Sequence, residues 1–150
     1  MDRDPIDIFY LKMAYLISER STCLSRNVGS VIVRHKTVLS TGYNGPPRGL
    51  DHCKVCIRKH MNIPSGEKLD ICRASHSEGN AIAQAAMNGV NIEGSTMYCT
   101  TQPCTYCAKL IANSGIKKLI YCEDYGNGMD ELTKEMLKNV EVQKIKLKRD

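Results

Sequence analysis

The sequence predicts an α/β protein of three layers, α/β/α, with a five-stranded mixed sheet between helices, and three observations support this prediction. Helical and strand-like segments alternate from residue 75 onward, which is typical of strands joined by right-handed helical crossovers. Two β-branched segments, 28–33 and 37–43, flank the polar turn Arg34-His35-Lys36 and predict a hairpin. Residues 6–19 precede them with apolar side chains at helical spacing.

The remaining elements follow from local patterns. Residues 75–88 predict a helix that stops at Gly89, and Pro103 opens another helix that closes before Gly115. The expected order is helix 6–19, strands 28–33 and 37–43, helix 75–88, strand 96–100, helix 103–113, strand 118–122, helix 129–139 and edge strand 140–147. Residues 44–73 show neither the helical nor the strand periodicity of apolar residues, so we interpret them as a functional loop or as a segment held by a metal.

Length and composition exclude several classes of protein. The 150 residues fit one domain, 1–150, and 42% hydrophobic with 25% charged residues is ordinary for a soluble globular chain. No apolar run reaches the ~20 residues of a membrane span, and the acidic start of the chain does not resemble a signal peptide. We therefore expect a cytoplasmic protein without a membrane partner.

The net charge of +5 is modest, and much of it lies near the end of the chain. We interpret this basic segment as a solvated tail in preference to a nucleic-acid surface. Its cations are Lys138, Lys144, Lys146, Lys148 and Arg149.

Cysteine is the outstanding feature of the composition, with eight residues. In a reducing compartment, Cys-x-x-Cys pairs more often hold a metal or perform redox chemistry than form structural disulfides. The chain has two such pairs, Cys53-x-x-Cys56 and Cys104-x-x-Cys107.

The clearest chemical pattern combines His76-Ser77-Glu78 with Cys104 and Cys107. One imidazole and two thiolates form the ligand set of an open zinc site, which keeps a fourth position for water. The two cysteines are three residues apart, so both sulfurs can face one point from a single helical turn. Both groups begin predicted helices, whose partial positive charge favours thiolate over thiol.

Glu78 lies two residues after the candidate ligand His76 and is predicted to be the catalytic acid–base. Zinc lowers the pKa of a bound water to ~7, and an adjacent carboxylate can carry its proton to a ring nitrogen and then to a departing amine. The pattern H-x-E…P-C-x-x-C is that of zinc-dependent nucleobase deaminases. A closed zinc knuckle or a redox pair is the alternative, and neither gives Glu78 a role.

Four segments of the chain resemble deoxycytidylate (dCMP) deaminases of the cytidine/deoxycytidylate deaminase superfamily. The similarity runs in family order over essentially the whole chain, and its segments are Gly-Tyr-Asn-Gly-Pro-Pro at 42–47, residues 72–82, residues 103–109 and residues 114–121. The resemblance implies a cytidine-deaminase-like fold and the hydrolysis of dCMP to dUMP and ammonia. The dUMP would serve as the substrate for thymidylate synthesis. The resemblance also implies that Asn44 contacts the deoxyribose and that the Ser77 backbone N–H contacts the base carbonyl. The family usually has Ala where this chain has Ser77.

Two further residues are candidates for the nucleotide's phosphate end. Arg26 is the leading phosphate ligand because a planar guanidinium matches phosphate geometry. Tyr125 follows a predicted strand and is placed to cover the nucleotide. A plain surface arginine and a packing tyrosine are the respective alternatives.

Some members of the family hold a second, structural zinc near the remaining cysteines. The resemblance therefore implies a site from Cys23, Cys53, Cys56 and Cys72, with His52 as a possible replacement ligand. Four thiolates would close a tetrahedral site and hold the irregular segment. Thiols that bind nothing are the alternative. Cys99 and Cys122 lie in predicted strands and are expected to be small core residues.

The resemblance also implies regulation and assembly. Many dCMP deaminases are hexamers activated by dCTP and inhibited by dTTP, with Mg²⁺ accompanying the triphosphate. The implied effector residues are Gly42, Tyr43, Asn44 and Gly45. Positions that assist this coupling vary among relatives, and this chain has Gln84 and Met87 there.

Two rival functions remain open at this point. One is a deaminase of adenosine in tRNA or of another nucleobase, although the absence of Trp and the single Phe argue against a stacking surface for a polynucleotide. The other is a zinc-binding module on a deaminase fold without activity, and the presence of Glu78 argues against it.

Overall fold

The computed structural model describes residues 1–148, so Arg149 of the predicted basic segment lies outside the described residues. The elements along the chain are α1 (Ile6–Ser18), β1 (Gly29–Arg34), β2 (Thr37–Tyr43), α2 (Ile57–His60), the 3₁₀ helix η1 (Leu69–Ile71), α3 (Ser77–Met87), β3 (Thr96–Thr101), α4 (Thr105–Asn113), β4 (Lys118–Glu123), α5 (Glu131–Met136) and β5 (Glu141–Lys144).

The five strands form one mixed sheet in the order β2-β1-β3-β4-β5. Strand β1 is antiparallel to both β2 and β3, whereas β3, β4 and β5 run parallel. His35 and Lys36 at the hairpin turn have φ angles of 51° and 59°, the left-handed conformation that a tight hairpin between right-twisted strands requires. The predicted fold class and the hairpin are confirmed.

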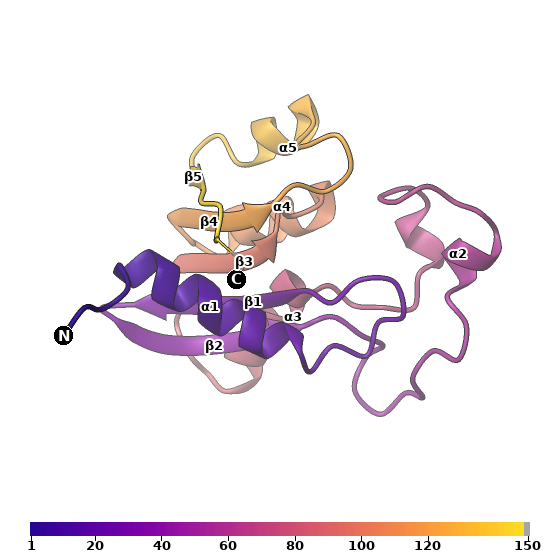
Figure 1. The fold of residues 1–150 in the computed structure, drawn as a ribbon, viewed down its shortest axis with the longest axis horizontal. Helices are drawn as coiled ribbons and strands as arrows, with labels where there is room; N and C mark the ends of the chain where they lie inside the picture. Colours follow the sequence, from indigo (N-terminus) through magenta and orange to yellow (C-terminus); the bar gives the residue numbers. More distant parts are fainter. Residues whose placement is uncertain (149–150) are drawn as a thin grey trace.

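Alternate residues of each central strand face opposite sides of the sheet and build two cores. Ile32, Met97 and Leu119 face the side covered by α3, α4 and α5. Val31 and Ile120 face the other side, where α1 packs. Figure 1 shows α1 in front of the sheet and α3 and α4 behind it. Successive residues of a strand point to opposite faces, and here both faces are buried. The sheet is therefore the middle of three layers.

The structure departs from the sequence-based expectation mainly in residues 44–73. This segment contains α2 and η1 in place of a loop without secondary structure, and α2 lies well away from the sheet in Figure 1. The last helix is shorter than predicted, at Glu131–Met136, and β5 is an edge strand whose four residues are all exposed. Within residues 1–148, no helix combines the length and the apolar character needed to cross a membrane.

The chain brings the first turns of α3 and α4 to the same place. Gly45, just after β2, forms an isolated antiparallel bridge with Ser75, and α3 begins two residues after Ser75. Strand β3 ends at Thr101, and a short connection leads into α4 at Thr105. The two helices therefore present their N-terminal backbone N–H groups to one region, where negative charge is favoured.

Candidate active site

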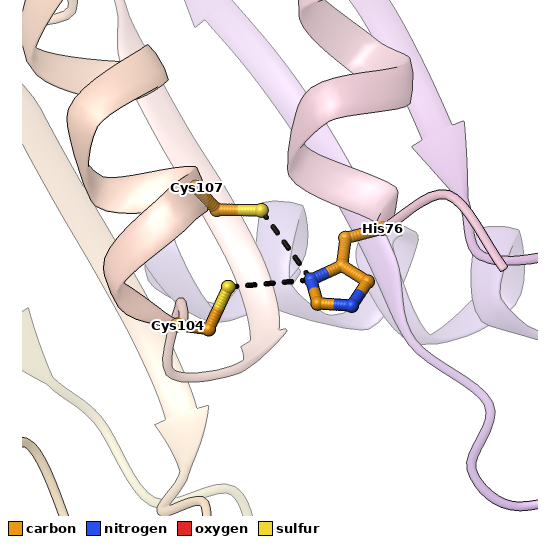
Figure 2. Close-up of side chains that lie close together, drawn as sticks. All are labelled: His76, Cys104 and Cys107. Carbon is orange, nitrogen blue, oxygen red and sulfur yellow. Dashed lines mark hydrogen bonds between the residues drawn. The ribbon is translucent and has the colours of Figure 1, made fainter. Parts of the chain in front are cut away.

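Three side chains converge between the N-termini of α3 and α4. His76 is the N-cap residue of α3, Cys104 is the N-cap residue of α4, and Cys107 follows within the first turn. The Sγ atoms of Cys104 and Cys107 lie 3.4 and 3.5 Å from His76 Nδ1, and both point to this nitrogen in Figure 2. The three donor atoms all lie within 4.8 Å of one another, and no other group of three such ligands occurs within residues 1–148.

The electrostatics of this cluster fit a soft, positively charged metal ion. The hydrogen bond with Cys107, together with the one to His76, lowers the pKa of the Cys104 thiol well below its usual value. The hydrogen bond with Cys104 raises the pKa of the His76 imidazole. Two sulfurs and one imidazole nitrogen are the donors that zinc prefers, and three of them leave one tetrahedral position open.

Glu78 lies beside the cluster, in the first turn of α3, and only 4% of it is exposed. Burial raises the pKa of its carboxyl group, although the charge of His76 opposes this shift. Ser77 Oγ donates to Oε2 at 3.2 Å, and Cys99 Sγ donates to Oε1 at 3.5 Å. A carboxyl group with a raised pKa is suited to take up and release a proton near neutral pH.

A second row of polar groups supports Glu78 from the protein interior. Ser30 Oγ is hydrogen-bonded to Ser77 Oγ at 2.7 Å and donates to Cys99 Sγ at 3.2 Å. All three residues are buried. The prediction that Cys99 and Cys122 are core residues is confirmed, but the contact of Cys99 with Glu78 was missed. Only the pairing of β1 with β3 and the packing of α3 reveal it.

A small pocket of about 80 Å³ opens onto this chemistry and is called the inner pocket below. Its lining includes His76, Glu78 and Cys104, and the candidate substrate ligands lie around them. All four of them line this pocket, namely Asn44, Ser77, Arg26 and Tyr125. Residues widely separated in the sequence thus meet in one cavity.

Asn44 is buried, and its side chain forms hydrogen bonds within the protein. Its Oδ1 accepts from the backbone N–H of Val28 at 2.9 Å and from the Ser21 hydroxyl. Its Nδ2 donates to the Arg26 carbonyl at 2.8 Å. Asn44 therefore holds the loop that carries Arg26, and one N–H of its amide remains available to a ligand.

Arg26 and Tyr125 form a pair at the mouth of the inner pocket. The guanidinium carbon of Arg26 lies 4.5 Å from the centre of the Tyr125 ring, a cation–π contact. Arg58 of α2 lines the same pocket and was not identified from the sequence. Its position two residues after Cys56 carries no periodic signal, because α2 is a single turn in an irregular segment.

The residues predicted to bind an effector divide between two cavities. Gly42, Tyr43 and Gly45 line a separate cavity of about 580 Å³, called the outer pocket below, whereas Asn44 lines the inner one. The outer pocket also contains Gln84 and Met87 of α3. Arg48 reaches across it and donates to Gln84 Oε1 at 3.2 Å and to Met87 Sδ at 3.3 Å.

The structure does not gather the predicted second set of ligands. Cys23, Cys53, Cys56 and Cys72 are free, partly buried thiols. No three of them lie close enough together to count as a metal cluster within residues 1–148. Cys23 and Cys72 instead line the inner pocket, and Cys53 Sγ accepts a hydrogen bond from Arg73 at 3.6 Å.

Residues 5–123 match the sequence model of the cytidine and deoxycytidylate deaminase zinc-binding region. The chain belongs to this deaminase family. Deoxycytidylate deaminase of Enterobacteria phage T4 is 40% identical over 147 residues, which cover 77% of this chain and 76% of the phage protein. The Schizosaccharomyces pombe deoxycytidylate deaminase is 38% identical over 91% of this chain, but the chain spans only 42% of that protein's length.

A solved deaminase has a closely similar fold. The dCMP deaminase of cyanophage S-TIM5, determined in complex with dCMP and dUMP, matches with a TM-score of 0.74 and 32% sequence identity. The match covers 96% of this chain and all of the phage chain. The predicted family and fold of this chain are therefore both confirmed.

Proposed function

We propose that this chain catalyses the hydrolysis of dCMP to dUMP and ammonia and thereby supplies dUMP for thymidylate synthesis. The observation that carries the proposal is the burial of the Glu78 carboxyl group beside the His76, Cys104 and Cys107 cluster, in the lining of the inner pocket. A structural zinc knuckle has no use for a buried acid in this position, whereas hydrolytic deamination requires one.

His76, Cys104 and Cys107 would hold the zinc ion. Zinc supplies Lewis-acid activation of water when it is bound. Glu78 takes a proton from the attacking water and delivers it to the ring nitrogen N3 of cytosine, and it then carries a second proton to the departing amine. The raised pKa of Glu78 favours this shuttle, because the group must be protonated and deprotonated within each cycle.

The walls of the inner pocket supply groups for the rest of the nucleotide. The Ser77 backbone N–H, at the first turn of α3, is assigned to the base carbonyl. The free amide N–H of Asn44 is assigned to the deoxyribose, and the guanidinium of Arg26 to the phosphate. Tyr125 covers the nucleotide while it holds Arg26 in place.

Rates with three substrates test this assignment. Purified protein loaded with zinc is incubated with dCMP, with deoxycytidine and with a tRNA anticodon stem-loop, and the ammonia released is measured. We expect rapid conversion of dCMP and kcat/KM at least about 100-fold lower for deoxycytidine, since losing contacts to a charged phosphate costs about 3 kcal/mol. Conversion of the stem-loop without conversion of dCMP would overturn the proposal.

We further propose that dCTP, accompanied by Mg²⁺, activates the enzyme and that dTTP inhibits it from the outer pocket. The Gly42–Gly45 segment separates the two cavities, with Tyr43 in the outer pocket and Asn44 in the inner one. Asn80 strengthens this wall by donating to the Tyr43 carbonyl at 2.7 Å and accepting from the Ser75 hydroxyl at 2.7 Å. A shift of Tyr43 is thereby transmitted to both Asn44 and the residue before His76. Rates that do not change with either triphosphate would refute regulation.

A homo-oligomer, with a hexamer favoured, is the expected assembly, and the cytoplasm is its expected location. Large apolar side chains are exposed on α4 and α5, where Tyr106, Leu110 and Leu132 are 64%, 48% and 51% exposed. Exposed apolar side chains of this size are common at protein interfaces. Light scattering coupled to gel filtration measures the mass, and a monomer at micromolar concentration would contradict the assembly.

A second, structural zinc on Cys23, Cys53, Cys56 and Cys72 is also proposed. The four thiols are partly buried in or next to the irregular segment, and metal binding can drive local folding that brings ligands together. Cys56→Ser is expected to lower the zinc content by one ion per chain without loss of the catalytic ion. An unchanged zinc content would remove this site.

A further inference from the structure

Helix α2 lies away from the sheet, yet one of its side chains lines the inner pocket. Figure 1 shows α2 at the far end of the irregular segment, away from the sheet. Arg58, its second residue, nevertheless lines the inner pocket together with Glu78 and Arg26. The neighbouring cation Lys59 is exposed and donates to the Leu24 carbonyl instead. Arg58 is therefore the cation of α2 that faces the pocket.

The partly buried guanidinium of Arg58 has one hydrogen-bond donor without a partner. Its Nε is buried and has no hydrogen-bond partner. One of its terminal nitrogens donates to the Pro64 carbonyl over a long 3.4 Å. Within residues 1–148, no carboxylate forms a salt bridge with Arg58 or with Arg26. A guanidinium that lines a pocket, with an unpartnered N–H donor and no carboxylate partner, can receive an anion.

Tyr125 fixes the two arginines relative to each other. Arg26 lies over the ring face at 4.5 Å, and the side chain of Arg58 interacts with the same tyrosine. The ring is in turn held against Gly66, where a Cβ atom would approach Tyr125 Cε1 to 2.9 Å. The segment from α2 to Gly66 thus clamps Tyr125 and leaves two positive charges directed into one cavity.

We propose that Arg58 is the second guanidinium of a phosphate site and that it makes the enzyme selective for nucleoside 5′-monophosphates over nucleosides. The inference rests on the proposed dCMP deamination. The irregular segment between β2 and α3 then carries a specificity residue to the pocket from outside the sheet. Arg26, which lies over the Tyr125 ring, and Arg58, which interacts with the same tyrosine, would bind the phosphate together.

Steady-state kinetics of matched variants test the role of Arg58. Arg58→Ala is expected to raise the KM for dCMP by about 10- to 100-fold and to leave kcat within about 3-fold, because charged hydrogen bonds to the phosphate form equally in ground and transition states. The kcat/KM for deoxycytidine stays within about 3-fold. Arg58→Lys restores part of the affinity as a point charge. Lys59→Ala, which removes the same charge from the same helix, is the control and leaves both substrates unaffected.

Binding of the product dUMP decides the question separately from turnover. Titration calorimetry on the zinc-loaded protein is expected to show a 10- to 100-fold weaker affinity for Arg58→Ala and little change in deoxyuridine binding, on the scale expected for charged hydrogen bonds. Equal losses for dUMP and deoxyuridine, with a lower Tm, would show a purely structural role and overturn the inference. Normal deamination of dCMP by a variant with unchanged KM would also overturn it, although the proposed function would stand. If the wild-type protein deaminated neither dCMP nor deoxycytidine, the proposed function would be refuted. The dUMP titration would still show whether Arg58 binds the phosphate.

Discussion

Glu78 is surrounded by small polar side chains that contact its carboxyl group from the protein interior. Ser77 and Cys99 each reach one of its oxygens, and Ser30 joins them from β1. These contacts orient the carboxyl group while burial raises its pKa. A short buried side chain with both oxygens held in place can move a proton without a large rearrangement, which is the requirement for a general acid–base.

Replacement of Glu78 separates metal binding from proton transfer. Glu78→Gln keeps the size and burial of the side chain but cannot carry a proton, so we expect kcat to fall by about 10²- to 10⁴-fold while the zinc content is unchanged. Metal analysis and single-turnover assays of the same preparation check both parts. Turnover at the normal rate would show that Glu78 has no acid–base role.

Ser77 is a second informative residue, because its backbone and its hydroxyl have different predicted roles. Its backbone N–H is the group assigned to the substrate, so Ser77→Ala is expected to keep kcat/KM within about 3-fold. The variant loses hydrogen bonds with Ser30 and Glu78, which lowers the free energy of unfolding by about 1 kcal/mol. Urea denaturation measures the stability. A large fall in kcat with normal stability would instead assign catalytic importance to the hydroxyl.

At the scale of elements, the site depends on how closely α3 packs against β2. A Cβ atom on Gly42 would lie 2.3 Å from the Ser77 carbonyl oxygen and 2.4 Å from the Ala81 backbone nitrogen. Both contacts are with backbone, which cannot rotate away. Glycine at this position therefore sets the distance between β2 and the helix that carries Glu78.

Gly42→Ala is accordingly expected to push α3 away from the sheet and to destabilise the protein by about 1–3 kcal/mol, with loss of activity. Gly79→Ala is the matched control in α3 itself, since its Cβ would meet only Leu110 Cδ1 at 3.6 Å. That control should be neutral or more stable by about 1 kcal/mol, because alanine favours helix. Thermal unfolding of both variants makes the comparison, and equal Tm values would contradict the packing argument.

At the scale of the whole molecule, the metal site joins the two halves of the fold. His76 is the N-cap of α3, which packs on the β1–β2 hairpin, whereas Cys104 and Cys107 lie at the start of α4, which connects the parallel strands β3 and β4. A zinc ion held by all three residues would cross-link these parts. Ligation therefore contributes to global stability as well as to chemistry.

Removal of the metal tests that link. Chelation is expected to abolish activity and to lower the Tm, since a ligand at 1,000 times its Kd stabilises the folded state by about 4 kcal/mol. Addition of zinc restores both properties. Metal analysis before chelation should give about two ions per chain if the second cysteine site is filled and about one if it is not. A Tm that is insensitive to chelation, in protein shown to contain zinc, would exclude the cross-link.

The layered fold, the hairpin and the zinc-site pattern could be predicted from the sequence, because each depends on local periodicity or on short spacing along one helical turn. The pattern consists of His76, Glu78, Cys104 and Cys107. The single-domain boundary 1–150 stays a prediction. Other features became visible only in the folded chain. Cys99 contacts Glu78, Ser30 contacts Ser77, Asn44 holds the Arg26 loop, and Arg58 reaches the inner pocket. The structure also shows that the other four candidate thiols do not converge within residues 1–148. These facts depend on which strands pair and on where a segment of irregular backbone returns to the sheet. Such long-range contacts leave no period in the sequence, since they are set by the packing of the folded chain.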